Sequence, residues 1–218
     1  PFSEEHGGLG GGHTDLSLIF EEFGKAIVVE PYLANVVLAG GVLKRSNLEN
    51  ADELIAGIVS GETQISLANY EPMKGFNLDN VDTTISSDGQ INGTKSTVLN
   101  AGNADHFIVF GKSGDGYAFG LVNKSSDGVK VVNYKTYDGF VSGDLVLENC
   151  KCDAVFSAEN ALEILEETIL DAIVCVSSEA VGAMEKSYKL TIEYTQQREQ
   201  FGQSLSKFQA LQHRMVDM

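Results

Sequence analysis

Hydrophobic and polar positions change their spacing twice along the chain. Before residue 62, apolar side chains recur every three or four positions, which is the spacing of one helix face. From residue 64, short β-branched and aromatic runs alternate with Gly, Asn, Asp and Ser, which is typical of strands and turns. From residue 157 the helical spacing returns. The pattern therefore predicts an α+β chain with a helical part at 1–62, an all-β middle domain at 63–156 and a second helical part at 157–218.

Three helices are predicted in the first part, at residues 14–24, 31–43 and 53–60. Either Thr14 or Asp15 could cap the first helix, and Gly61 suits the left-handed turn that ends the third. The second helix is almost wholly apolar but too short to cross a membrane, so we expect it to be buried. The glycine-rich segment 1–12 lacks the G-x-G-x-x-G spacing of a dinucleotide loop, which favours a flexible turn.

Short runs with strand-forming composition follow one another through the middle part, at 65–68, 83–85, 89–92, 96–99, 106–110, 117–122, 129–134 and 144–147. They predict a sandwich or barrel of about seven strands, with no internal helix. Residues 86–89 and 123–128 are rich in Asp, Asn, Ser and Gly, and we expect both segments to be hairpin turns.

The last part begins with a long helix, for which Ser157 is the expected N-cap. Its apolar positions form one stripe: Ile169, Ile173, Val176, Ala180, Met184, Tyr188, Thr191 and Tyr194. We expect most of this stripe to be core, with part of it facing another subunit. Glu179 lies close to the stripe, where a carboxylate needs a hydrogen-bond partner. It is either a buried, hydrogen-bonded residue or a catalytic one.

Residues 194–218 are the most informative stretch and have the sequence YTQQREQFGQSLSKFQALQHRMVDM. The long helix is predicted to end near Arg198, with a left-handed turn at Gly202. A second helix is predicted from Ser206, because Ser206 and Gln209 have the spacing of a capping box. The corner presents an Arg, which can grip a phosphate, and a Phe, which can cover a flat ring. The alternative is an ion-paired surface Arg and a core Phe.

Composition and charge narrow the classes of function. The formal net charge of −16 argues against nucleic acids and anionic membrane surfaces as partners. No apolar run reaches membrane length, and no signal-peptide pattern opens the sequence. Cys150, Cys152 and Cys175 are an odd, sparse set that suits a reducing compartment, so a cytoplasmic location is expected. The four histidines are dispersed and the Cys150–Cys152 pair lacks a second pair, so no metal site is predicted.

The corner stretch resembles the signature of a known family. Its pattern YxxxRxQFGxxLxxFQxLQHxxxDM closely resembles the C-terminal domain of the acyl-CoA dehydrogenase family. Two further patterns, INGTKxxVxNAxxADxxIV and DGxxSGDLxLxN, resemble the family's β-domain. Residues 1–62 resemble the second, C-terminal half of the family's N-terminal helical domain, and they look most like the branch that includes the small subunit of pimeloyl-CoA dehydrogenase. The resemblance covers essentially the whole chain, so it implies the family's fold.

The resemblance also implies an activity and a set of partners. Members of this family use FAD to oxidise an acyl-CoA thioester to a trans-2-enoyl-CoA, and they pass the electrons to an electron-transferring flavoprotein. They assemble as tetramers, so a homo- or heterotetramer is expected here. The residues that the resemblance assigns to FAD binding are Arg198, Phe201, Gly202, Gln209 and Gln212. In the family, this Arg and Phe reach the FAD of a neighbouring subunit.

The family's catalytic base, a Glu, has no match among these residues. In most relatives it lies beyond the position of Met218, and in a minority it occupies the position of Ala172, which has no carboxylate. Because the sequence begins at Pro1 and stops inside a predicted helix, we expect a fragment that is inactive on its own. The sequence does not specify the length or branching of the acyl chain.

Two stretches depart from the family pattern. Many relatives have YxxTEPxxGSD around the flavin and pyrophosphate, whereas this chain has LANYEPMKGFN, with Tyr70 for the Thr and Phe76-Asn77 for Ser-Asp. Where relatives have WITNG beside the flavin ring, Thr97 replaces the Trp and Leu99 replaces a hydrogen-bonding Thr. Two hypotheses remain open: a dehydrogenase with a flavin in its own β-domain, or a flavin-poor partner subunit that completes the FAD site of a sister chain. A purely structural, inactive fragment is a third.

Overall fold

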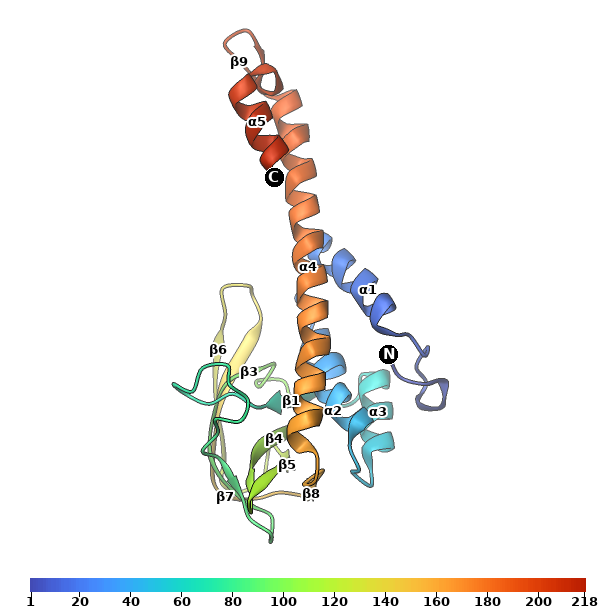
Figure 1. Cartoon of the computed structure of the whole chain (residues 1–218), viewed down its shortest axis with the longest axis vertical. Coiled ribbons are helices and arrows are strands. Elements are labelled where there is room, and N and C mark those ends of the chain that lie inside the picture. The colour runs from blue at the N-terminus through green and yellow to red at the C-terminus, as the bar shows by residue number, and fades with distance from the viewer. The chain divides into compact units, whose positions relative to one another are not determined.

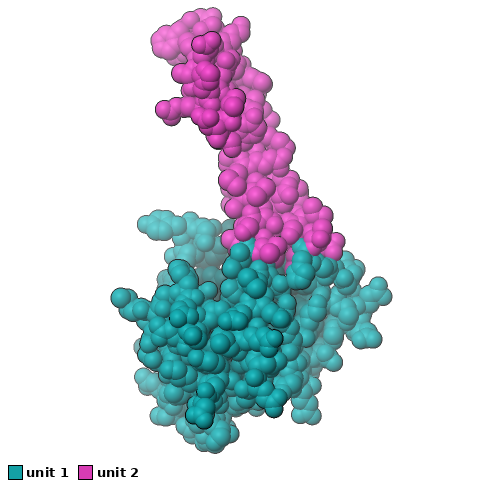
Figure 2. Space-filling view, in the orientation of Figure 1, with its two compact units in different colours: residues 1–13, 29–173 teal, residues 14–28, 174–218 magenta.

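The computed structural model describes residues 1–218 (Figure 1). The chain forms two compact units, each built from segments that are distant in the sequence. The first unit holds Pro1–His13 and Val29–Ile173, and the second holds Thr14–Val28 and Val174–Met218 (Figure 2). The helices and the mixed sheet confirm the α+β class, while the division of the sequence into three domains stays a prediction. None of the helices combines the length and the apolar character that a membrane span requires.

In the first unit, the helices before the sheet are η1 (Glu4–His6), the π-helix η2 (Leu33–Ala39), α2 (Gly40–Arg45) and α3 (Ala51–Ser60). The segment predicted as one helix is therefore two helices of different type, η2 and α2. Asn35 of η2 is buried, donates its Nδ2 to the carbonyl oxygen of Thr63 at 3.3 Å and accepts the N–H of Ile65 at 2.8 Å. These bonds tie η2 to the start of the sheet. As predicted, α3 ends at Gly61, which has a left-handed φ of 79°.

Eight strands form the sheet of the first unit: β1 (Ile65–Ala68), β2 (Thr84–Ile85), β3 (Gln90–Leu99), β4 (His106–Ser113), β5 (Gly116–Asn123), β6 (Val129–Lys135), β7 (Val141–Lys151) and β8 (Ala154–Phe156). Their order is β6-β7-β3-β2-β4-β5-β8, with β1 pairing parallel to β4. No helix interrupts this segment, which confirms the predicted all-β middle part. The core behind the sheet includes Ile91, Phe107, Val109 and Leu145, which are all fully buried.

Three details of the strand prediction were wrong. The runs at 89–92 and 96–99 are one strand, β3, whose pairing with β7 shifts register twice, and β8 was not foreseen. Residues 123–128 do not form a hairpin, because β5 pairs with β4 and β8 whereas β6 pairs with β7. The turn at 86–89 is confirmed by the Gly89 N–H, which donates to the Ser86 carbonyl oxygen at 2.8 Å.

The long helix α4 extends from Ala161 to Gln197 and contributes residues to both units. Ser157 is not its N-cap, because the helix begins four residues later. Ser157 instead has a left-handed φ of 53°, and its N–H donates to Asn47 Oδ1 at 2.8 Å. The residues of α4 that are buried within the first unit include Ile164, Leu165, Thr168 and Ala172.

In the second unit, α1 (His13–Ala26) packs against α4 through two glycines. A Cβ added at Gly24 would lie 1.9 Å from the Glu179 carbonyl oxygen, and one added at Gly182 would lie 1.9 Å from the Glu21 carbonyl oxygen. The two helix backbones therefore approach closely only because neither position carries a side chain. Helix α1 begins at His13, so Thr14 and Asp15 lie in its first turn and do not cap it.

The apolar stripe predicted on α4 is mostly exposed, which corrects the expectation that it is core. Ile173, Val176, Met184, Tyr188 and Tyr194 are between 37% and 62% exposed. In the second unit the reason is that α1 packs on the side of Gly182, which lies about 200° around the helix from Met184. The predicted contact of this stripe with another subunit stays a prediction.

Candidate functional site

The corner after α4 is a tight hairpin. Strands β9 (Glu199–Gln200) and β10 (Gln203–Ser204) pair antiparallel, and Phe201 and Gly202 form the turn between them. Their φ values of 56° and 80° are both left-handed, as in the two-residue turns that match strand twist. The 3₁₀ helix η3 (Leu205–Lys207) and α5 (Gln209–Asp217) follow. The long helix thus ends near the predicted residue, but a β-hairpin connects it to the next helix.

The predicted capping box at Ser206 was wrong. Ser206 belongs to η3, its hydroxyl pairs with that of Ser204 at 3.0 Å, and α5 begins only at Gln209. The residue before α5 is Phe208, which offers no side-chain cap. Gln212 reaches back instead, with its Nε2 donating to the Ser206 carbonyl oxygen at 2.9 Å. This hydrogen bond therefore links the first turns of α5 to η3.

Phe201 is exposed and its backbone is strained. It is 91% exposed, so the interpretation of this residue as a core Phe was wrong. Its only ring contact is edge-on to Phe208, with the centroids 6.2 Å apart. A left-handed φ costs a residue with a Cβ about 1–2 kcal/mol, and such strain concentrates at functional sites. The hairpin therefore exposes the large apolar side chain of Phe201 to solvent in spite of this backbone strain.

Arg198 presents a guanidinium that no other side chain engages. Its backbone is fixed, since its N–H donates to the Tyr194 carbonyl oxygen at 2.9 Å and its own carbonyl oxygen accepts the Leu205 N–H at 2.8 Å. Its side chain is exposed and makes no hydrogen bond or ion pair. Arg45 shows the contrast, because its guanidinium bonds the carboxylates of Glu167 and Asp171 at 3.0 and 2.7 Å. The alternative of an ion-paired surface Arg at position 198 is therefore wrong.

The structure brings together all five residues predicted to bind FAD. Three lie in the hairpin and two lie in the first turns of α5, where both glutamines are exposed. The set combines a free guanidinium, an exposed aromatic ring and two amides. This chemistry suits a ligand with a phosphate and a flat ring.

A buried ion pair lies in the first unit and was missed by the sequence interpretation. Lys95 is fully buried in β3, and its Nζ donates to Glu71 Oε1 at 2.7 Å and to the Asn69 carbonyl oxygen at 3.3 Å. The Glu71 carboxylate also accepts the N–H groups of Asp82 and Thr83, at 2.6 and 2.9 Å. We call this arrangement the Glu71 latch. It ties both ends of the loop at residues 72–82 to one carboxylate.

The Glu71 latch is ionised at neutral pH. Burial pushes the pKa of Glu71 up, but the hydrogen bonds from Lys95 and from the two backbone N–H groups outweigh it and lower the pKa to about 2. Burial lowers the pKa of Lys95 to about 8, although Glu71 acts in the opposite direction. Nothing in the sequence pattern placed these two charges together, because they lie 24 residues apart in the chain.

Two aromatic side chains lie beside the latch, at positions where the family pattern has hydroxyls. The rings of Tyr70 and Phe76 meet edge to face, with centroids 5.8 Å apart and planes at 90°. The Tyr70 carbonyl oxygen accepts the N–H of Ser96 at 2.9 Å, which places this pair next to β3. Thr97 follows with a left-handed φ of 55°, and its N–H donates to Asp144 Oδ1 at 3.2 Å.

Helix α4 carries no evident catalytic base. Ala172 is buried and has no ionisable group, and the neighbouring Asp171 is engaged by Arg45 at 2.7 Å and lies 3.3 Å from His13 Nδ1. Glu179 is half-buried, with its backbone against Gly24 of α1. These contacts give Asp171 a structural role.

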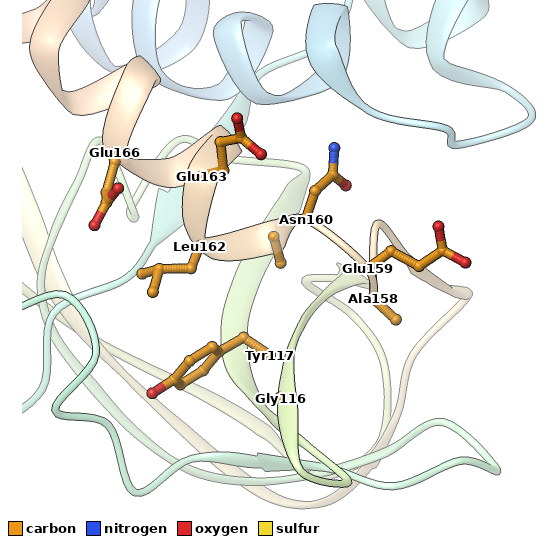
Figure 3. Close-up of a pocket in the computed structure, with 9 residues that line it drawn as sticks. Gly116, Tyr117, Ala158, Glu159, Asn160, Leu162, Glu163 and Glu166 are labelled. Carbon is orange, nitrogen blue, oxygen red and sulfur yellow. The ribbon is translucent and has the colours of Figure 1, made fainter.

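A hollow of about 350 Å³ lies in the first unit at the start of α4 (Figure 3). Its charged lining residues are Glu159, Glu163 and Glu166, whose carboxylates point in different directions (Figure 3). Tyr117 lines the opposite side and is held by its own contacts, a hydrogen bond to the Asp79 carbonyl oxygen at 3.1 Å and a stacked Phe110. Because its polar groups do not converge, the hollow lacks the character of an active site.

Comparison with known proteins agrees with the fold and includes a match over the C-terminal segment. Residues 162–218 match the acyl-CoA dehydrogenase C-terminal domain. Over 233 residues the chain is 26% identical to the caffeyl-CoA reductase–Etf complex subunit CarC of Acetobacterium woodii, covering 97% of this chain and 60% of that protein. The ChsE4–ChsE5 complex of Mycobacterium tuberculosis contains a chain of similar structure, with a TM-score of 0.85 and 27% identity, over 98% of this chain and 58% of that one.

The FAD complex of PigA shares the fold, with a TM-score of 0.92 at 23% identity over 100% of this chain and 62% of that one. The chain spans about three fifths of the length of the curated relatives it matches. The narrower likeness to the pimeloyl-CoA dehydrogenase small subunit stays a prediction. Residues 162–218 therefore match the acyl-CoA dehydrogenase C-terminal domain, and over nearly its whole length the chain is similar in sequence and fold to acyl-CoA dehydrogenases.

Proposed function

We propose that the chain is a subunit of a FAD-dependent acyl-CoA dehydrogenase, which converts an acyl-CoA thioester to a trans-2-enoyl-CoA and passes the electrons to an electron-transferring flavoprotein. The observation that carries this proposal is the corner, where the free Arg198 guanidinium lies beside the strained, exposed Phe201. Two relatives support the partners by name: PigA as a FAD complex and CarC as a subunit of an Etf complex.

We assign each residue of the corner a different contact with FAD. The planar Arg198 guanidinium can bind a pyrophosphate through two parallel hydrogen bonds, and Phe201 can cover a flat ring. Gly202 provides the left-handed turn that exposes Phe201, and Gln209 and Gln212 add amide groups at the start of α5. When bound, FAD supplies the hydride acceptor for the oxidation. Following the family, we assign this cofactor to a neighbouring subunit of the tetramer.

The proposal assigns the catalytic base to no residue of this chain. Ala172 has no carboxylate, and the Asp171 carboxylate is engaged by Arg45. A base must be within reach of the proton it removes and must be free to accept it. We therefore expect residues 1–218 alone not to oxidise an acyl-CoA.

A second candidate is a partner subunit that performs no chemistry itself. Phe76 favours it, because this apolar ring, which contacts Tyr70 edge to face, replaces a hydroxyl residue of the family's flavin segment. The ChsE4–ChsE5 complex is a two-protein assembly among the similar structures. In both candidates the corner serves a flavin on another chain, so the homo- or heterotetramer is part of the proposal.

The corner is tested with Arg198→Ala in the intact protein, co-expressed with its sister chain where one exists. Losing a charge-assisted contact of this kind costs about 1.5–3 kcal/mol, so FAD affinity should fall roughly ten- to a hundredfold. Arg198→Lys should fall between the two, because Lys cannot form the paired bonds. Flavin absorbance per subunit measures occupancy, and acyl-CoA-dependent dye reduction over a series of chain lengths measures activity.

Arg214→Ala is the matched control, because Arg214 is also an exposed Arg without an ion pair and lies on α5 of the same unit. Its flavin content should equal that of the wild type. Circular dichroism must show that both variants fold. Equal occupancy of wild type and Arg198→Ala at limiting FAD would reduce Arg198 to an ordinary surface charge and overturn the proposal.

A further inference from the structure

Ser3, His6 and Asp52 form a row of hydrogen-bonded side chains in the first unit. The Ser3 hydroxyl lies 2.9 Å from His6 Nδ1, and His6 Nε2 lies 2.9 Å from Asp52 Oδ1. A hydroxyl within reach of a base that a third group orients is the arrangement that activates a serine as a nucleophile. Such an arrangement is identified by its geometry and not by its place in the sequence.

Asp52 decides which nitrogen of a neutral His6 carries the proton. An ionised carboxylate only accepts hydrogen bonds, so Nε2 is the protonated nitrogen and donates to Asp52. Nδ1 is then the acceptor, and it faces the Ser3 hydroxyl. The two nitrogens are exchanged relative to the serine proteases, in which Nδ1 faces the Asp, but either nitrogen of the ring can accept a proton. His6 therefore presents a basic nitrogen to the hydroxyl, as general base catalysis requires.

The turn that carries Ser3 and His6 is held by its backbone and by one buried ring. The Ser3 carbonyl oxygen accepts the N–H groups of His6 and Gly8, at 3.1 and 2.9 Å. The neighbouring Phe2 is buried, and a Cβ added at Gly40 would lie 2.4 Å from its ring. Ser3 precedes η1 at the N-cap position, where a serine usually bonds backbone N–H groups. Its hydroxyl makes no such capping bond and is directed to His6 instead.

The row is open to solvent at both ends. Ser3 is exposed, the His6 side chain is 22% exposed and the Asp52 side chain is 86% exposed. The exposed hydroxyl is accessible to a substrate, but solvent weakens the contact between His6 and Asp52. We therefore expect a modest activation of Ser3, sufficient for acyl groups that already carry a good leaving group.

We propose that Ser3 is a nucleophile for activated acyl esters and thioesters, with His6 as its base and Asp52 as the residue that positions His6. Ser3 Oγ forms a bond to the carbonyl carbon, and its proton moves to His6 Nδ1. The bond to the leaving alcohol or thiol then breaks, and the leaving group takes the proton from His6. The product is an acyl ester of Ser3, which water hydrolyses with His6 again as the base. This transfer consumes no oxidant and no flavin, so it goes beyond the proposed function.

The probe for this site is p-nitrophenyl acetate, added to the intact protein. A positioned general base typically contributes roughly 10²–10⁴-fold, and an exposed base should reach only the lower part of this range. Release of p-nitrophenolate should therefore be at least about tenfold faster for the wild type than for Ser3→Ala or His6→Gln. Mass spectrometry of the rapidly quenched wild type should find the acetyl group on Ser3. The same adduct with an acyl thioester as the probe would show that both leaving groups are accepted.

The positioning role of Asp52 has its own pair of variants. Asp52→Asn should slow the acetylation of Ser3, whereas Asp52→Glu, which keeps a carboxylate for Nε2, should restore it. Ser60→Ala is the matched control, because Ser60 is an exposed Ser of the same unit whose hydroxyl bonds only the Gly57 carbonyl oxygen, at 3.1 Å. Its rate should equal that of the wild type, and circular dichroism must show that every variant folds.

Two results would overturn the proposal. An unchanged rate in Ser3→Ala would mean that His6 or another group reacts with the ester directly. Equally fast acetylation of Ser3 in a folded His6→Gln variant would mean that His6 is not its base. These assays measure no flavin, so either result leaves the corner proposal standing. That proposal fails separately if the Arg198→Ala assembly keeps its full flavin content.

Discussion

Replacing Lys95 by Met tests how much the Glu71 latch contributes to the stability of the first unit. Lys95 is fully buried and Glu71 is 7% exposed, so Met would leave a carboxylate without its counter-ion in the interior. Breaking a buried pair on one side typically costs about 3–5 kcal/mol. The N–H groups of Asp82 and Thr83 still bond the carboxylate, which places the expected loss at the lower end, about 3 kcal/mol.

Urea unfolding followed by circular dichroism measures this loss, and trypsin cleavage at Lys74 in the loop reports whether the loop is released. Lys189→Met is the matched control, because Lys189 also pairs with a Glu but on the surface of α4, where such pairs contribute about 0.3–0.5 kcal/mol. The double variant Glu71→Gln/Lys95→Met should be more stable than Lys95→Met, since it buries no unpaired charge. A loss for Lys95→Met no larger than that for Lys189→Met would refute the reasoning.

Three further outcomes are expected. The pKa of Glu71 is lowered from 4.5 to about 2 in the folded chain, so the unfolded chain binds more protons between these two pH values. About 3 kcal/mol of the free energy of unfolding should therefore be lost as the pH falls through this range. Glu71→Gln, compared with the wild type by urea unfolding at each pH, should lack this loss. Gly182→Ala should loosen α1 from α4 and cost about 1–3 kcal/mol, because its Cβ would meet the Glu21 backbone, whereas Gly116→Ala meets nothing and should be neutral by the same assay. Phe201→Asn should match or exceed wild-type stability by up to about 1 kcal/mol, since Asn tolerates a left-handed φ, while flavin occupancy of the assembly falls; a clear loss of stability would contradict the strain at this turn.

The order of the elements was predictable because it depends on local spacing. The switch from helical to strand spacing and back placed every helix outside the sheet, and the stop at Gly61 followed from one residue type. The details that failed depend on contacts between distant residues. The π-helix η2 is fixed by bonds from Asn35 to Thr63 and Ile65, and the start of α4 is delayed by a bond from Ser157 to Asn47. Local propensity carries no information about such partners.

The prediction that the apolar stripe on α4 is buried failed for a different reason. Helical spacing shows which residues share a face, but it does not show which face another element covers. Close approach of α1 depends on small residues, and Gly24 and Gly182 mark the buried side more reliably than the apolar positions do. In the part of α4 that contacts α1, small residues therefore predict the contact better than hydrophobic residues do.

The corner and the Glu71 latch also differ in how far sequence can describe them. The corner residues follow one another along the chain, so a pattern that contains Arg198 and Phe201 nearly specifies the site, and the structure adds the exposed ring and the unengaged guanidinium. At the Glu71 latch the carboxylate and its Lys95 partner are 24 residues apart, and the N–H groups of Ser96 and Thr97 beside it are removed from use by partners in two other segments. A motif can show that a donor is present, but only the contacts show whether it is already used.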